Sequence, residues 1–227
     1  TEKVIEKARK IAAHMLEAPE QDLELKDGAF TIAGTDRSVN FKDVVGAAFT
    51  PNKLPEDVEP GLFEIATYNA TKPNFPNGCH VCEVEIAPDT GEMELARYTV
   101  IDDCGVELNP LLVKGQVHGG IAQGLGQAIL ERTVYDEEGQ LLSATLQDYT
   151  LPRADDMPDI HFETRNVPCK TNLLGMKGAG EAGAIGACPA VVNAVVDALH
   201  RAAGIDHIDM PMTPEKVWRV LHEAQAA

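Results

Sequence analysis

Lys177-Gly178-Ala179-Gly180-Glu181-Ala182-Gly183 is the stretch that most constrains the fold, because it sets a carboxylate among residues with almost no side chains. Glycine on both sides of Glu181 removes bulk near the carboxylate and favours close approach by a substrate or a cofactor. Burial there would suit a general base. A solvated glutamate in a glycine-rich surface loop explains the same residues, so this stretch leaves both interpretations open.

The glycines of this loop also match, in form, the G-x-G-x-x-G fingerprint of dinucleotide-binding proteins. That interpretation is rejected for three reasons. No clear β-branched strand precedes the loop, Glu181 would stand where a pyrophosphate docks, and no strand–helix alternation surrounds it. The stretch from Gly175 to Gly186 instead leads into a helix that Pro189 is expected to open and Gly204 to end.

A second glycine-rich stretch, Gly115 to Gly126, lies inside a predicted helix that Asn109-Pro110 begins and that runs to about Arg132. Each of its glycines costs about 0.5–1 kcal/mol against alanine, so some other interaction must offset them. Close packing of a neighbouring element is favoured. The alternative is approach by a large ligand, with Gln116 supplying donors and an acceptor near a helix end that suits an anion.

The other elements mix helices and strands without strict alternation, which favours an α+β fold with mixed sheets, packed helices and two lobes that meet near 70–78. Helical spacing from Val4 to Leu16 predicts a first helix that Pro19 stops, and Asp27-Gly28 predicts a hairpin turn. Further helices are expected at 41–49 and after Thr213-Pro214. Strands are expected at 62–69, 79–87, 92–101, 133–135, 141–149 and 160–166, with a short one reaching Met212.

Composition limits the classes of partner. Asp and Glu number 36 against 19 Lys and Arg, giving a net charge of −17 that repels nucleic acid and anionic membranes. No stretch is read as a membrane span. The five cysteines are odd in number and do not indicate a disulfide framework, so a reducing, cytoplasmic location is expected.

Other chemistry-bearing residues give no metal site. Cys79 and Cys82 stand three apart in a predicted strand, so their thiols face opposite sides and are taken as structural. Asp102-Asp103 is more simply a hydrogen-bonded turn than an acid pair, and His118 is more simply structural than a ligand. The seven histidines show no metal-ligand spacing.

As an ordered set, these motifs resemble the large subunit of the molybdenum hydroxylases, the xanthine dehydrogenase family, and are most similar to its aerobic carbon-monoxide-dehydrogenase branch. The resemblance covers essentially the whole chain. The segments that carry it are Glu83–Ile86, Thr90-Gly91, Asp102–Gly105, Asn109-Pro110, Gly115–Gly124, Asp148–Arg153, Lys177–Gly183 and Pro189–Ala194.

The resemblance implies an oxidoreductase that hydroxylates a carbon centre with a water-derived oxygen. It implies that Glu181 is the general base toward the molybdenum-bound hydroxyl, that Gln116 and Gly115 contact the pterin cofactor, and that the Gly178–Ala179–Gly180 backbone lies by the metal. It also implies a molybdopterin cytosine dinucleotide, with iron–sulfur clusters and FAD on partner subunits.

Large subunits of that family are several times longer than this chain, so residues 1–227 are expected to be part of its second molybdenum cofactor-binding domain, with the remainder of the subunit as a partner. An isolated chain is then expected to bind the cofactor weakly or not at all. The small-molecule substrate stays open between an aldehyde, an N-heterocycle and carbon monoxide. The alternative is a non-catalytic assembly or cofactor-handling module that retains the fold.

Overall fold

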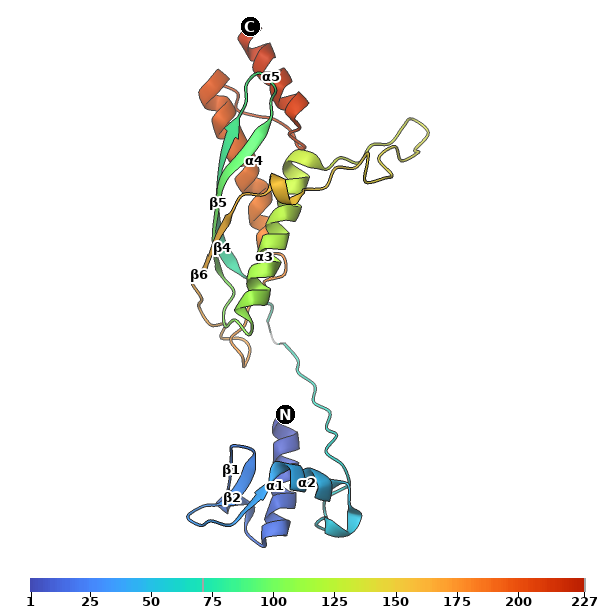
Figure 1. The fold of residues 1–227 in the computed structure, drawn as a ribbon, viewed down its shortest axis with the longest axis vertical. Helices are drawn as coiled ribbons and strands as arrows, with labels where there is room; N and C mark the ends of the chain where they lie inside the picture. Colours follow the sequence, from blue (N-terminus) through green and yellow to red (C-terminus); the bar gives the residue numbers. More distant parts are fainter. Residues whose placement is uncertain (71, 227) are drawn as a thin grey trace. The chain divides into compact units, whose positions relative to one another are not determined.

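The computed structural model describes residues 1–70 and 72–226, and it divides between Asn69 and Ala70 into two compact units. The division lies at the edge of the 70–78 range in which the sequence places a lobe boundary; residue 71 of that range lies outside the described residues. Each unit has its own hydrophobic core and is described by itself (Figure 1).

The first unit packs two helices with a three-stranded antiparallel sheet in the order β1-β2-β3. Asp27 and Gly28 have φ of 48° and 76°, which a two-residue hairpin turn requires, and this confirms the predicted hairpin. Ile11, Phe30 and Val44 are fully buried in its core. The elements are α1 (Glu2–Leu16), η1 (Glu20–Asp22), β1 (Leu23–Lys26), β2 (Ala29–Ile32), β3 (Ser38–Asn40), α2 (Phe41–Ala48) and η2 (Pro51–Lys53).

The second unit is built on a mixed sheet, in which β5 pairs antiparallel with β4 and parallel with β6. Side chains alternate between its faces, so Tyr98, Val100 and Asp102 are buried on the face that the helices cover. The elements are β4 (Asn77–Ile86), β5 (Met93–Asp103), α3 (Pro110–Leu125), η3 (Gly126–Leu130), η4 (Ala154–Asp156), β6 (Ile160–Thr164), α4 (Ala182–Ala203) and α5 (Pro214–Ala226). This confirms the α+β class.

Helices α3 and α4 lie side by side over this sheet (Figure 1). Asn109 caps α3 as predicted, because its Oδ1 accepts the N–H of Leu112 at 3.2 Å. The helix continues past Leu125 as one π-helical turn, η3, that ends at Leu130. Gly204 ends α4 with φ of 69°, which is also as predicted.

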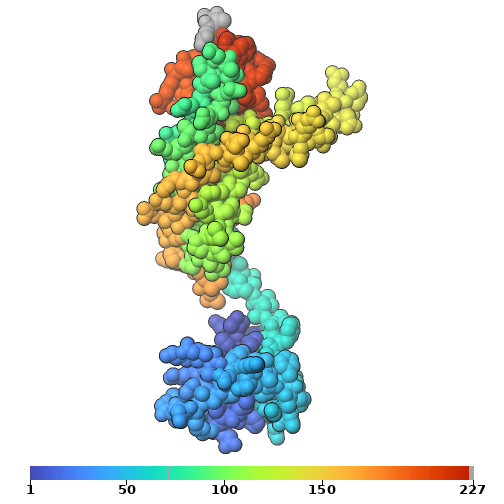
Figure 2. Space-filling model, in the orientation of Figure 1, coloured from blue at the N-terminus to red at the C-terminus, as the bar shows by residue number. Residues whose placement is uncertain are grey.

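The chain between η3 and η4, residues 131–153, projects as a long loop, drawn yellow in Figure 1 and visible as an arm in Figure 2. Its base is held where the Tyr149 hydroxyl donates to Glu131 Oε2 at 2.5 Å and where the Val134 N–H donates to Ser143 Oγ at 3.0 Å. A single bridge between Tyr135 and Leu141 replaces the strands predicted for 133–135 and 141–149.

Three further predictions were wrong. Residues 62–69 form no strand, because no neighbouring strand offers hydrogen bonds among the described residues. No strand reaches Met212, whose N–H donates instead to Ala128 O. Pro189 does not open the helix: α4 begins at Ala182, and Pro189 lies inside it as an exposed residue.

Helix α4 also corrects the statement on membrane spans. It is 22 residues long, and by length and composition alone it could cross a membrane. Val191, Val195 and Leu199 on its inner face are nevertheless buried against the sheet and α3, as in the core helix of a globular unit.

Candidate functional site

The two glycine-rich motifs meet in the second unit. The Gln116 side chain, on the second turn of α3, donates from Nε2 to the backbone oxygen of Gly180 at 3.0 Å, although the two residues are 64 apart in sequence. Glu181 follows Gly180 directly and precedes the first turn of α4. The residues named from the sequence as a cofactor contact and a base are therefore neighbours in the fold.

Small residues bring α3 and α4 close enough for this meeting. A Cβ at Gly183 would lie 2.2 Å from Val117 O, and one at Gly120 would lie 2.7 Å from Ala184 N. Gly124 makes a similar contact, with Ala187 Cβ 2.7 Å away. This close packing offsets the helical cost of these three glycines. The sequence argument favoured such packing for Gly120 and Gly124, and for them it is confirmed.

Other glycines of the two motifs do not pack on anything described. A Cβ at Gly115, Gly119, Gly178 or Gly180 would have no heavy atom within 4 Å. For these four, close helix packing does not explain the glycine. Open backbone is what the alternative explanation, approach by a ligand or by other polypeptide, requires.

Glu181 occupies the N-cap position of α4, with φ of −108° and ψ of −4°. Its side chain is exposed, so burial of the carboxylate is not provided by this chain. Within the described residues, the N–H groups of Ala179, Gly180 and Glu181 have no protein acceptor. Free N–H groups before a 22-residue helix form an anion-accepting edge.

The loop before Glu181 is anchored at Lys177. Lys177 Nζ lies 2.5 Å from Asp103 Oδ2, and the Lys177 N–H donates to Cys104 O at 2.9 Å. Desolvation opposes ionisation of Asp103, but the hydrogen bonds from Lys177, Val167 and Gly105 outweigh it and lower the pKa of this carboxyl to about 2. Asp103 is thus the ionised half of a structured pair rather than a solvated turn residue.

Residues 169–176 form the stem of this loop. The Asn172 side chain forms two hydrogen bonds with the backbone of Met176. Its Nδ2 donates to Met176 O at 2.8 Å, and its Oδ1 accepts the Met176 N–H at 3.2 Å. Gly175 O accepts the N–H groups of both Val106 and Cys169. These bonds fix the chain direction just before Lys177.

The Asp103 carboxyl predicts a loss of stability in acid. Its pKa is lowered from 3.8 to about 2, so the pair contributes stability above pH 4 that disappears as pH falls toward 2. Thermal unfolding followed by the fluorescence of Trp218, the single tryptophan, should show this decline. In Asp103→Asn the decline between pH 4 and 2 should be smaller than in the parent chain; an equal decline would contradict the assignment.

The other face of the β5 end carries a buried polar cluster. His80 Nδ1 lies 2.7 Å from the Tyr98 hydroxyl, and His80 Nε2 lies 3.6 Å from Asp102 Oδ1. A Cβ at Gly186 would lie 2.4 Å from the His80 ring, so this ring supports the first turns of α4. Asp102 Oδ2 is buried without a partner among the described residues.

The remaining candidates are two thiols on β4 and a histidine on α3. Cys79 is exposed and Cys82 is half-buried, on opposite faces of β4, and burial followed by the charge of Glu83 raises the pKa of Cys82 to about 11. The His118 ring packs edge-on against Phe162, and burial lowers its pKa. No group of three or more potential metal ligands occurs within the described residues.

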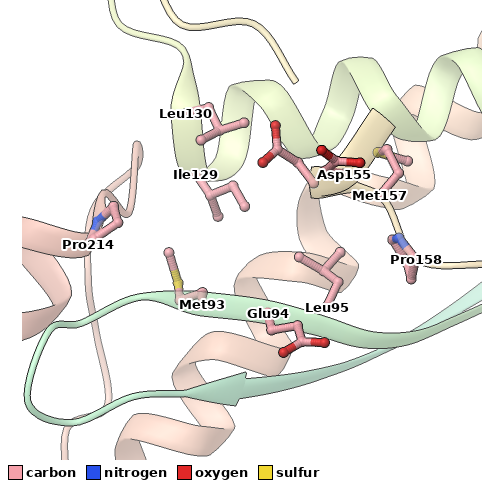
Figure 3. Close-up of a pocket in the computed structure, with 10 residues that line it drawn as sticks. Met93, Glu94, Leu95, Ile129, Leu130, Asp155, Met157, Pro158 and Pro214 are labelled. Carbon is pink, nitrogen blue, oxygen red and sulfur yellow. The ribbon is translucent and has the colours of Figure 1, made fainter. Parts of the chain in front are cut away.

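The cavity drawn in Figure 3 lies elsewhere. It measures about 220 Å³ and is lined from β5, η3, η4 and the start of α5 by residues that include Leu95, Ile129 and Met157. From Gln116 to Leu130 the helical rise is about 20 Å, so this cavity lies toward the opposite end of α3 from Glu181. It is not part of the candidate site.

Sequence reasoning did not find the support around the loop. Asn74 Oδ1 accepts the Gly178 N–H at 3.1 Å, and Asp103 holds Lys177. Both partners are distant in sequence, and no local spacing marks either contact. The signal that could have suggested the second was a lone lysine opening a glycine-rich loop.

Comparison with known proteins identifies the fold. The family model described as "Molybdopterin cofactor-binding domain" matches residues 1–158. The chain belongs to this family. It is 38% identical over 228 residues to the carbon monoxide dehydrogenase large chain of Hydrogenophaga pseudoflava, a match that covers 99% of this chain and 28% of that one.

Two solved structures share the fold of this chain over nearly its whole length. Carbon monoxide dehydrogenase from Oligotropha carboxidovorans aligns with a TM-score of 0.87 and 34% identity, over 99% of this chain and 28% of that one. Quinoline 2-oxidoreductase from Pseudomonas putida 86 aligns with a TM-score of 0.84 and 38% identity, over 97% and 28%. The chain thus spans little more than a quarter of the length of these relatives.

Proposed function

We propose that this chain is part of the second molybdenum cofactor-binding domain of a molybdenum hydroxylase large subunit, with Glu181 as the general base of a carbon-hydroxylating oxidoreductase. The single observation that carries the proposal is the contact between Gln116 and the residue preceding Glu181. It joins the two motifs that the family resemblance assigns to one site.

The residues of the site fit an anionic, oxygen-rich cofactor. The unpartnered N–H groups of residues 179–181 are donors at the positive end of α4, and the glycines beside them leave the backbone open. The residues that would hold the cofactor are Gln116, Gly115, Gly178, Ala179 and Gly180. Gln116 donates one N–H of its side chain to Gly180 O, so the other N–H and Oε1 remain for a ligand.

When bound, the molybdopterin cytosine dinucleotide would supply the two-electron oxidation. Glu181 takes up a proton at its carboxylate from the water-derived oxygen nucleophile, as its open position at the loop end allows. The Gln116 side chain holds the backbone of Gly180, and this helps to fix the backbone position from which the Glu181 side chain extends. Burial of Glu181 comes from the remainder of the large subunit, because this chain leaves it exposed.

The proposed assembly contains the rest of the large subunit, an iron–sulfur subunit and an FAD subunit in the cytoplasm. The relatives act on carbon monoxide and quinoline by name, so carbon monoxide, an N-heterocycle and an aldehyde are the substrate classes to test. A non-catalytic assembly module remains the second candidate. The enzyme is placed first because the open glycines leave room for a cofactor directly beside a carboxylate that can accept a proton.

The first test is the molybdenum content and the native mass of the complex that carries this chain in its source cells. We expect about one molybdenum per copy in an assembly much heavier than the 24.4 kDa of this chain. The isolated 227-residue chain is expected to hold far less than one. Turnover is then measured with carbon monoxide, quinoline and an aldehyde, using a dye as electron acceptor. A molybdenum-free, lone small protein would refute the proposal.

A further inference from the structure

Lys177 is the last buried anchor of the loop before Glu181. Its side chain is 13% exposed and that of Asp103 is 15% exposed, and the two charged atoms lie 2.5 Å apart. The backbone N–H of Lys177 also bonds to Cys104 O. One residue is therefore fixed twice to the end of β5, through its side chain and through its main chain.

The acceptor of this ion pair is itself rigid. Asp103 Oδ1 accepts the N–H groups of Gly105 and Val167, each at 3.0 Å. The neighbouring Asp102 O accepts the Arg165 N–H at 2.9 Å, which extends the pairing of β5 with β6. Lys177 is thus attached to the end of the sheet and not to another loop.

Beyond Lys177 the supports become weaker. Between Lys177 and Glu181, the described residues hold the loop through two exposed side-chain hydrogen bonds, from the Gly178 N–H to Asn74 Oδ1 and from Gln116 Nε2 to Gly180 O. Gly178 and Gly180 have no side chains that could pack. On its other side Glu181 is held by α4, because Glu181 O accepts the Ile185 N–H at 3.0 Å. The position of Glu181 therefore depends on Lys177 at one end of the loop and on the first turn of α4 at the other.

The part-buried ion pair contributes stability, but an apolar pair of similar size could stabilise this corner as well without directing the loop. Its directed geometry is useful where a loop must be placed accurately. Misplacement of a reacting group by about 1 Å can lower a rate about 100-fold. Resting on the proposed function, we propose that the Lys177–Asp103 ion pair is the positioning element that aims the Glu181 carboxylate in the hydroxylase reaction.

Two variants remove the ion pair with little other change. Asp103→Asn keeps an oxygen for the N–H groups of Gly105 and Val167 but removes the charge, and Lys177→Met keeps the length of the side chain. In the 227-residue chain, hydrogen exchange of a peptide covering residues 176–186 should become about tenfold faster in both variants. Exchange in β4 and β5 should change much less. Unchanged exchange at 176–186 would overturn the proposal.

In the assembled, molybdenum-loaded enzyme, both variants should lower kcat per bound molybdenum about 10- to 100-fold and leave KM within about twofold. The substrate is whichever of carbon monoxide, quinoline and the aldehyde the complex turns over. The decisive measurement adds Lys177→Met to Glu181→Gln. If the pair acts through Glu181, the double variant should be no slower than Glu181→Gln alone.

The outcomes separate this inference from the proposed function. Wild-type kcat in Lys177→Met and Asp103→Asn, with Glu181→Gln inactive, would overturn the positioning role alone. An activity loss that only follows lost molybdenum, or a full further loss in the double variant, would also overturn it by showing a purely structural or an independent effect. Full activity of Glu181→Gln would refute both the base assignment and the inference that rests on it.

Discussion

Glu181→Gln in the assembled complex is expected to lower kcat about 10²- to 10⁴-fold, the contribution typical of a positioned general base. Glutamine has nearly the same shape but cannot accept the proton at neutral pH. Molybdenum content should stay unchanged, because the residues proposed to hold the cofactor are Gln116 and the backbone of residues 178–180. The measurement is steady-state turnover normalised to bound molybdenum, which separates chemistry from cofactor loading.

Two matched variants control this experiment. Glu137→Gln removes the same charge from an exposed position on the projecting loop and should leave kcat unchanged. Glu181→Asp keeps a carboxylate but withdraws it by one methylene, so an intermediate rate is expected. If the Glu181→Gln enzyme turned over at nearly the original rate, the assignment of Glu181 as the base would be contradicted and a non-catalytic role for this loop would be favoured.

Gly183→Ala is expected to destabilise the second unit by about 2–4 kcal/mol, the range of a severe overpacking change. The added Cβ would lie 2.2 Å from Val117 O and 2.9 Å from Ile121 N, and neither backbone atom can move without shifting α3. Urea unfolding followed by Trp218 fluorescence reports on the second unit, since the single tryptophan lies in α5.

Gly119→Ala is the matched control, because it makes the same chemical change in α3 where a Cβ has no heavy atom within 4 Å. It should stabilise the isolated chain by about 0.5–1 kcal/mol through helix propensity alone. Equal effects of the two substitutions would show that the close α3–α4 contact does not carry the stability assigned to it.

Local signals predicted much of the fold. The Asp27-Gly28 turn, the cap at Asn109 and the helix end at Gly204 each depend on the backbone preference of one or two residues, and all three are confirmed. The strand predicted for 141–149 failed because a strand needs a partner, which no local pattern supplies. The prediction that Pro189 opens the helix was wrong for a different reason. Its ring is tolerated on the exposed side of α4, seven residues after the helix begins.

In the candidate site, too, local signals were predictable from the sequence and contacts with distant residues were not. Gln116 was noticed because it lies in a glycine-rich helix, and Glu181 because it is a charged residue among small ones. The family resemblance gave both residues roles that experiments must test. The packing argument made for the Gly115–Gly126 stretch was right for Gly120 and Gly124, whereas Gly115 and Gly119 have no packing partner among the described residues. Asp103 does form the expected hydrogen-bonded turn, because its Oδ1 accepts the Gly105 N–H, but its ion pair with Lys177 was missed because the two residues are 74 apart in sequence.

Gly183 belongs both to the loop that carries Glu181 and to the contact between α3 and α4. Any side chain at Gly183 would therefore disturb two features at once, the spacing of the two helices and the direction in which the chain enters α4 beside Glu181.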